Sequence, residues 1–362
     1  MSAQTITEPI RHPDQTDINL IDCDIHNGLR PALNKFIPDK WRTYHERFGR
    51  RGFGGATYPK SQPGAHRTDA WPPNGGSPGS NLPFLQEQLL DAWNIDLGIL
   101  NTLTPIRNQL PEYDAAFARA INTCQAAEWL DPEPRLRASL IVAFENGNLA
   151  AEEIDRMAQD PRFVQVLLPT FTSAPLGNRK YWPLYEAAQR NNLPVGIHFG
   201  GGNGGHPITG TGWPSYYIEY HAGMAQAFQH HVISLIFEGV FDQFPNLKLV
   251  LIEGGMAWLP ALSWRLDRTY DQLKDEVPHV QHPPSHYIRN HIWVTTQPME
   301  EPEKPEHFNQ FLEHYDQPDR LLFATDYPHW DFDAPDRAFP IKISPNLERM
   351  VKVENAMNLY RF

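Results

Sequence analysis

The chain has 362 residues and a formal net charge of −12. Its charged (20%) and aromatic (12%) fractions are typical of a folded protein and exclude a chain that is disordered throughout. The acidic balance argues against a basic nucleic-acid-binding surface, and no run approaches the ~20 consecutive apolar residues that span a bilayer.

Residues 1–17 form a polar tail without the apolar stretch of a secretory signal peptide. The two cysteines, Cys23 and Cys124, are too few for a disulfide framework and favour a reducing compartment. We therefore expect a cytoplasmic protein that binds neither membranes nor nucleic acids.

Short runs rich in Val, Ile and Leu recur along the chain, as expected for strands with both faces buried. The predicted strands are 18–23, 96–103, 136–144, 163–168, 194–199, 248–253, 292–296 and 321–325. Predicted helices lie between them, at 113–130, 149–159, 181–191, 219–244, 258–273 and 303–314. Alternating strands and helices predict a parallel α/β sheet. Eight strands favour closure into a (β/α)8 TIM-like barrel, which we expect to form a single domain over 18–362.

Two long segments interrupt this alternation. Residues 49–82, predicted to be a loop insertion, follow the first strand, and residues 200–215 follow the fifth. Both are rich in glycine, and loops of this length in a compact domain are usually functional or disordered. Each follows a strand, at the end of the barrel where active sites lie.

Acidic and imidazole side chains occur at the predicted carboxyl ends of four strands. Asp24 and His26 end the first strand, His198 the fifth, Glu253 the sixth and Asp326 the eighth. Each residue alone could be structural, as a turn cap or a buried histidine, but in a barrel these strand ends meet on one rim. Asp24 and His26 are two residues apart, so both side chains point to the same side of a strand. The set predicts a metal site made of Asp24, His26, His198 and Asp326.

The segments IDCDIH (21–26), GIH (196–198), FPNLKLVLIEGG (244–255) and LFATDYPH (322–329) resemble a known family. It is the amidohydrolase-related family that includes aminocarboxymuconate semialdehyde decarboxylase and resorcylate decarboxylase. The resemblance extends over about residues 19–360. It implies a distorted (β/α)8 barrel, the same four ligands and one divalent metal ion, often zinc or manganese. The reactions it implies are non-oxidative decarboxylation and hydrolysis.

The sequence departs from the family pattern at the end of the sixth strand. Family members usually have a histidine before the paired glycines, where this chain has Glu253. A carboxylate there could complete the metal shell, activate metal-bound water or hydrogen-bond a ligand histidine. The fourth strand ends without a lysine, in LLPT (167–170), which argues against a carbamylated lysine bridging two metals and favours a single ion.

Other candidates are less specific. His221 is a possible catalytic acid, and it could equally be a histidine on a helix surface. His329 and Trp330 are expected to contact substrate or to serve packing. Arg51 lies in a basic group that suits a substrate carboxylate, and Trp213 could belong to an aromatic wall for a flat substrate.

The leading prediction is a carboxy-lyase that removes CO2 from an aromatic or unsaturated carboxylic acid, a preference that comes from the resemblance. The metal would act as Lewis acid and template, and Glu253 or His221 would donate the proton. The alternative is a metal-dependent hydrolase of an amide, ester or lactone, with Asp326 or Glu253 as general base.

A non-catalytic ligand-binding barrel is a remote third possibility, because all four metal donors are present. Mixed histidine and carboxylate donors suit zinc, manganese or iron and do not fix the metal; we expect zinc, with manganese or iron as alternatives. We expect a small-molecule substrate and consider a homodimer or higher homo-oligomer possible.

Overall fold

The computed structural model describes residues 18–48, 65–104, 110–200 and 211–362. Eight parallel strands follow one another in chain order around a single sheet. They are β1 (Ile21–Ile25), β2 (Leu97–Leu100), β3 (Leu136–Ile141), β4 (Phe163–Pro169), β5 (Val195–His198), β6 (Leu249–Ile252), β7 (Ile292–Thr295) and β8 (Leu321–Leu322). Backbone hydrogen bonds from Cys23 N to Phe323 O (3.0 Å) and from His26 N to Tyr327 O (2.7 Å) join the first strand to the last segment. The predicted (β/α)8 barrel is confirmed.

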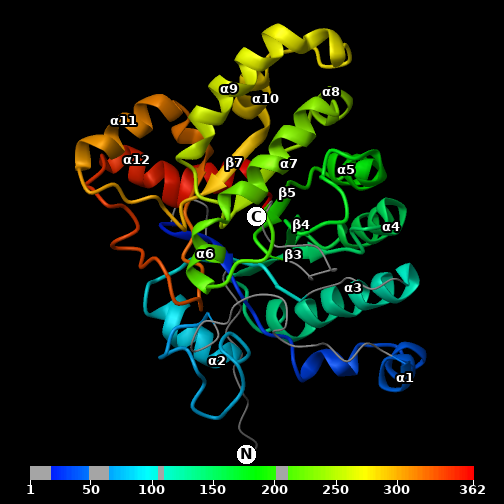
Figure 1. Ribbon diagram of the computed structural model, residues 1–362. Helices are drawn as coiled ribbons and strands as arrows, with labels where there is room; N and C mark the ends of the chain where they lie inside the picture. Colours follow the sequence, from blue (N-terminus) through cyan, green and yellow to red (C-terminus); the bar gives the residue numbers. More distant parts are fainter. Residues whose placement is uncertain (1–17, 49–64, 105–109, 201–210) are drawn as a thin grey trace, which may run out of the picture.

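The helices surround the strands (Figure 1). The longer ones are α1 (Asp39–Phe48), α3 (Pro111–Gln125), α4 (Gly147–Met157), α5 (Trp182–Arg190), α7 (Ala225–Phe237), α9 (Trp258–Leu273), α10 (Pro284–His291) and α11 (Pro305–Tyr315). The shorter ones are α2 (Leu82–Leu85), α6 (Tyr217–Ala222), α8 (Val240–Gln243), α12 (Pro345–Arg349) and α13 (Asn355–Leu359). Single 3-10 or π turns occur at Ala32–Lys35, Gln86–Asp91, Ala126–Leu130, Arg179–Tyr181, Lys274–Glu276, Pro318–Arg320 and Met350–Glu354.

Local sequence explains where these elements begin and end. Every residue of β1, β5 and β6 is buried: β6 is a continuous apolar run, and the polar residues of β1 and β5 are the buried Asp22, Asp24 and His198. The predicted helix 219–244 was wrong in extent, because it is divided into α6, α7 and α8. Gly239 adopts φ 77° between α7 and α8, a left-handed conformation that ends a helix and that glycine adopts without strain.

The strand boundaries differ from those predicted from the sequence, and two of the differences concern candidate ligands. β1 extends to Ile25, so Asp24 lies within the strand and not at its end. β8 ends at Leu322, so Asp326 lies beyond the strand, in the following segment. Asp326 and Glu253 both have positive φ, at 58° and 61°. Such strain in non-glycine residues is characteristic of functional sites, where the surrounding structure holds it in place.

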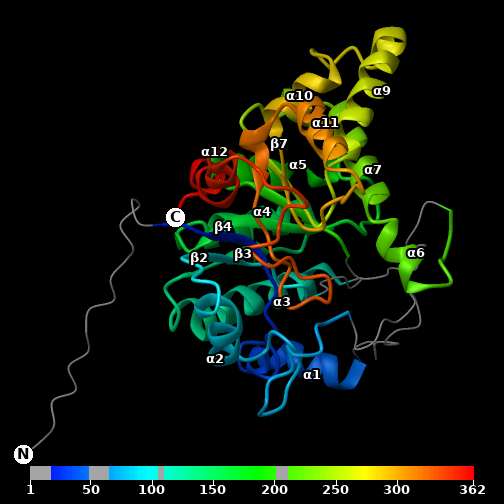
Figure 2. The same ribbon diagram turned by 90° about the vertical axis from the view of Figure 1, so that its left-hand side faces the viewer.

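The two ends of the barrel differ. Figure 2 shows α6 at one end and the C-terminus of the chain at the other. α6 belongs to the connection that follows β5, so it lies at the end formed by the carboxyl ends of the strands. The two predicted loops lie partly outside the described residues, at 49–64 and 201–210.

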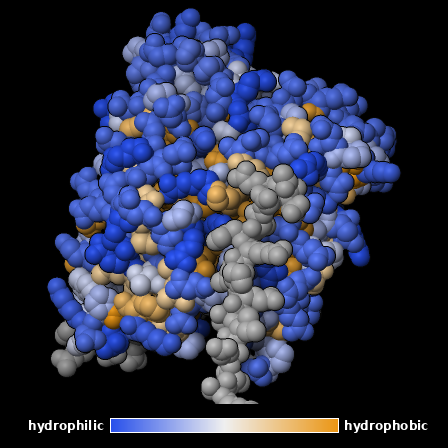
Figure 3. Space-filling view, turned by 180° about the vertical axis from the view of Figure 1, so that it is seen from behind, coloured by the Kyte–Doolittle hydropathy of each residue, from blue (hydrophilic) through white to orange (hydrophobic). Residues whose placement is uncertain are grey.

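The surface seen from behind is largely hydrophilic, with apolar side chains in separate small groups (Figure 3), in keeping with the charge of −12. Within the described ranges, no helix is both long and apolar enough to cross a membrane.

Candidate metal centre

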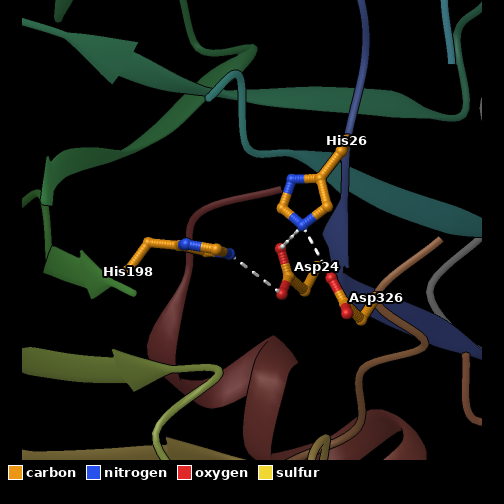
Figure 4. A group of neighbouring side chains, drawn as sticks. All are labelled: Asp24, His26, His198 and Asp326. Atoms are coloured by element: carbon orange, nitrogen blue, oxygen red, sulfur yellow. Dashed lines mark hydrogen bonds and ion pairs between the residues drawn. The ribbon is translucent and has the colours of Figure 1, made fainter. Parts of the chain in front are cut away.

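Four side chains from distant parts of the sequence converge inside the barrel. One potential ligand atom from each of Asp24, His26, His198 and Asp326 lies within 4.8 Å of the others. Figure 4 shows the two imidazoles and two carboxylates pointing toward a common centre. His26 Nε2 lies 2.7 Å from Asp326 Oδ1 and 3.5 Å from Asp24 Oδ1, and His198 Nε2 lies 3.5 Å from Asp24 Oδ2. The structure therefore brings together the four residues predicted to bind a metal.

Backbone contacts between β1 and the segment after β8 hold Asp326 in place. Its amide donates to the carbonyl oxygen of Asp24 (3.1 Å). The buried carboxylate of Asp22 accepts from both Thr325 N (3.0 Å) and Thr325 Oγ1 (2.6 Å). Asp22 therefore joins the two segments next to the residues at the centre.

The arrangement fits a cation. Asp24 Oδ2, His198 Nε2 and Asp326 Oδ2 are buried and make no hydrogen bond with any described residue. His26 Nδ1 lies 2.7 Å from the carbonyl of Asn101, and His198 Nδ1 lies 2.7 Å from the carbonyl of Phe199. Each Nδ1 therefore carries its proton and donates it to a carbonyl, so each Nε2 faces the centre as a potential ligand. Buried polar atoms without partners are costly, and a divalent cation would satisfy all of them.

The charges at the centre are unevenly distributed. Burial alone would lower the pKa of His26, but the charge of Asp24 and the hydrogen bond to Asp326 outweigh it and raise the pKa to about 9. Burial alone would raise the pKa of Asp326, but the contacts with His329 and His26 lower it well below its usual range. In the absence of a cation, protonated His26 thus balances part of the carboxylate charge.

Glu253 lies at the edge of this centre, directly after β6. Its Oε2 atom is 3.3 Å from His198 Nε2. Burial, followed by the charges of Asp326 and Asp24, raises the pKa of Glu253 well above its usual range. Glu253 therefore tends to hold a proton next to the candidate ligands.

His329 and His221 make different contacts. His329 Nδ1 lies 2.7 Å from Asp326 Oδ1, and its ring lies 4.5 Å from the ring of His26. His221 Nε2 lies 2.9 Å from Asp331 Oδ2, and Gln297 Nε2 donates to the same oxygen (3.0 Å). His329 therefore contacts the four-residue centre itself, whereas His221 pairs with a carboxylate beside it.

Aromatic side chains connect α6 to the segment after β8. The ring of Trp330 lies 5.1 Å from that of His221, and its indole Nε1 donates to Tyr217 OH (3.2 Å). Burial raises the pKa of Tyr217 to about 12, with smaller contributions from nearby carboxylates that include Glu253 and Asp326. The Tyr217 phenol therefore lies within the electrostatic field of the centre.

The remaining two predicted residues are Trp213 and Arg51. Trp213 is 47% exposed on the segment leading into α6, and no ring contact links it to the described aromatic residues. Arg51 lies outside the described residues.

The sequence argument missed Asn101, whose backbone carbonyl accepts from His26 and whose side chain donates to Asp24 Oδ1 (2.8 Å). It also missed Asp22 and the pairing of Asp331 with His221. Asn101 follows β2 directly, but the predicted strand continued to residue 103, so Asn101 did not stand at a predicted strand end.

Comparisons with known proteins agree with this site. A family model described as amidohydrolase matches residues 21–362. The gamma-resorcylate decarboxylase of Polaromonas sp. (strain JS666 / ATCC BAA-500) is 25% identical over 292 residues, covering 76% of this chain and 86% of that enzyme. The gamma-resorcylate decarboxylase of Rhodococcus jostii (strain RHA1) is 28% identical over 200 residues, covering 50% of this chain and 58% of that enzyme.

Solved structures share the fold. A 2,6-dihydroxybenzoate decarboxylase from Rhizobium superposes with a TM-score of 0.66 at 19% identity, covering 94% of this chain and 98% of that one. A dihydroxybenzoic acid decarboxylase from Polaromonas sp. JS666 was solved with manganese and the inhibitor 2-nitroresorcinol. It superposes with a TM-score of 0.65 at 20% identity, covering 94% of this chain and 96% of that one. The family match over residues 21–362 confirms the resemblance inferred from the motifs, and the chain belongs to the amidohydrolase family.

Proposed function

We propose that this protein is a metal-dependent non-oxidative decarboxylase of an aromatic or unsaturated carboxylic acid. The observation that carries the proposal is the buried group of two imidazoles and two carboxylates, with the carboxyl group of Glu253 at its edge, 3.3 Å from His198 Nε2. Further support comes from the curated relatives, which are named as gamma-resorcylate decarboxylases.

In the proposal, Asp24, His26, His198 and Asp326 hold one divalent cation. When bound, the cation supplies Lewis-acid chemistry and a template for a substrate carboxylate and a neighbouring oxygen. Nitrogen and carboxylate donors suit zinc, manganese and iron. Manganese gains support because the Polaromonas structure contains it.

Glu253 is the proposed proton donor. In the site without a cation, burial raises its pKa and favours the protonated form that a general acid needs. The proton goes to the carbon that carried the carboxylate. The C–C bond to the carboxylate breaks, its electron pair forms the new C–H bond, CO2 leaves, and Glu253 becomes a carboxylate that regains a proton from solvent.

Trp330, Tyr217 and His221 are proposed to contact the substrate ring. They belong to one group of rings connected to α6, and aromatic side chains suit a flat ligand. His221 remains the alternative proton donor because Asp331 orients its imidazole. Arg51 and Trp213 remain candidates for contact with the rest of the substrate.

The proposed setting is the cytoplasm, which the two free, buried cysteines support. The proposal also includes assembly of the chain into a homodimer or a higher homo-oligomer.

The test is a substrate panel with manganese- and zinc-loaded protein. One half contains aromatic and unsaturated carboxylic acids, including 2,6-dihydroxybenzoate, the compound bound in a structural relative. The other half contains amides, esters and lactones. We expect CO2 release, with loss of the acid's absorbance, from the first half only. Release of an amine or alcohol from the second half without CO2 from the first would replace the proposal with the hydrolase alternative. Metal binding without turnover of either half would favour a ligand-binding barrel.

A further inference from the structure

We infer that Asn101 is a positioning residue that selects which atoms of Asp24 and His26 face the metal. A buried polar strut, formed by Asn101, Ser139, Gln165 and Tyr360, holds it in place. The inference rests on the metal site of the proposed function and does not depend on decarboxylation.

Asn101 contacts both ligand residues supplied by the first strand segment. Its side-chain Nδ2 donates to Asp24 Oδ1 (2.8 Å) and to the carbonyl of Cys23 (3.2 Å). Its own carbonyl accepts from His26 Nδ1 (2.7 Å). The first contact occupies Oδ1 of Asp24 and leaves Oδ2 without a partner. The second fixes the proton of His26 on Nδ1, so that Nε2 is the nitrogen available to a cation.

The rest of the strut fixes the amide of Asn101 in one orientation. Ser139 Oγ and Gln165 Nε2 (3.1 Å) both donate to Asn101 Oδ1. Gln165 Nε2 also donates to Ser139 Oγ (2.8 Å), and Tyr360 OH donates to Gln165 Oε1 (3.0 Å). Reversing the Asn101 amide would place its oxygen against the Asp24 carboxylate and its NH2 against two donors. Only the observed orientation therefore satisfies every partner.

The strut extends through the interior of the barrel. Asn101, Ser139 and Gln165 lie on or directly after the successive strands β2, β3 and β4, and all three are fully buried. Tyr360 follows α13, close to the C-terminus, which lies at the end of the barrel opposite α6 (Figure 2). Contacts thus link that end of the barrel to the metal ligands.

The neighbouring strand leaves space for this strut. A Cβ at Gly196 of β5 would lie 3.1 Å from Gln165 Oε1, closer than ordinary contact. Burying amides and hydroxyls is costly unless all are hydrogen-bonded, and aliphatic side chains would fill a barrel core without that cost. Positioning of the ligands gives these polar residues a function that packing alone does not.

The test compares Asn101→Leu with Asn122→Leu. Asn122 is a matched control because it is also fully buried and its amide makes three hydrogen bonds, to Ile141 O (2.8 Å), Glu153 Oε1 (2.8 Å) and Ile141 N (2.9 Å). None of these partners is a candidate ligand. The full-length proteins are stripped of metal and titrated with Mn²⁺ against a competing chelator, and their thermal stability is measured in the stripped form.

We expect both variants to lose stability, and only Asn101→Leu to bind Mn²⁺ about 10- to 100-fold more weakly, the usual effect of removing a group that orients a ligand. Unchanged Mn²⁺ affinity in Asn101→Leu, or an equal loss in Asn122→Leu, would overturn the inference. If Asn101→Leu does not fold, Ser139→Ala removes one donor to the same amide oxygen and should weaken Mn²⁺ binding in the same direction; wild-type affinity in that variant would also overturn it. Failure of the wild-type chain to bind Mn²⁺ or Zn²⁺ would count against the proposed function itself.

Discussion

His26 Nε2 and Asp326 Oδ1 lie 2.7 Å apart, although 300 residues separate them in the sequence. The barrel makes this contact possible by bringing the first strand next to the segment after the last. In the protein without metal, protonated His26 donates to Asp326. A cation bound at the centre would take the place of that proton.

Metal affinity should therefore depend on pH. His26 must lose its proton to bind a cation, and its pKa is about 9 because Asp24 and Asp326 outweigh the effect of burial. We expect the Mn²⁺ affinity to rise by about tenfold per pH unit below this pKa. Chelator competition from about pH 6.5 to about pH 8.5 measures it, and calorimetry in buffers of different ionisation enthalpy should show proton release on binding. A flat profile without proton release would contradict the assigned state of His26.

Glu253→Gln tests the proposed acid. Glutamine keeps the shape of the side chain but cannot donate a proton as the acid does. Decarboxylation should fall by about 10²- to 10⁴-fold, while manganese content stays at the wild-type level. His221→Ala, assayed in parallel, tests the alternative donor. Full turnover in Glu253→Gln combined with loss in His221→Ala would transfer the role to His221.

Asp22→Asn tests the link between β1 and the segment after β8. Burial raises the pKa of Asp22 to about 7, although hydrogen bonds from Thr325 and Asp24 lower it in part. A carboxyl whose pKa is raised on folding stabilises the protein most below its unfolded pKa of 3.8, and this contribution is lost as the pH rises to about 7.

As the pH rises from about 4 to about 7, the metal-free wild type should thus lose unfolding free energy relative to Asp22→Asn. The expected loss is on the order of 1 kcal/mol per pH unit. Urea unfolding at several pH values measures this difference. Parallel curves for the two proteins would show that Asp22 titrates normally.

Trp330→Leu tests whether the group of rings formed by Trp330, Tyr217 and His221 contacts the substrate. The Trp330 ring packs against His221, and Trp264 on α9 packs against His314 at a similar centroid distance, 5.3 Å compared with 5.1 Å. Both tryptophans are about half exposed, so Trp264→Leu is a matched control. We expect Trp330→Leu to raise the KM for an aromatic acid about 2- to 10-fold, which corresponds to the interaction free energy of one aromatic pair. An equal effect of Trp264→Leu would contradict a specific contact between Trp330 and the substrate ring.

The order of strands and helices could be predicted from the sequence because buried parallel strands are continuous apolar runs. The convergence of the four predicted ligands could also be predicted, because His198 ends β5 and the other three lie close to strand ends. The short helices α6 and α8 were not separated from α7, because the glycines that divide them lie in one apolar stretch.

The contacts that hold the candidate ligands and His221 in place were harder to predict from the sequence. Asp331 pairs with His221 of α6, 110 residues away, and this contact depends on tertiary packing. Asn101 and Gln165 are neutral amides among many, and their function becomes visible only from their contacts across strands. Sequence spacing carries no information about such contacts.

Metal content of His198→Ala is the most direct measurement of the central claim. His198 supplies one of the two imidazoles and ends β5, and its Nε2 has no hydrogen-bond partner among the described residues. The account predicts one divalent ion per chain in the wild type and little or none in His198→Ala, with a folded barrel by circular dichroism and no decarboxylation. Metal content and turnover at wild-type levels in that variant would contradict it.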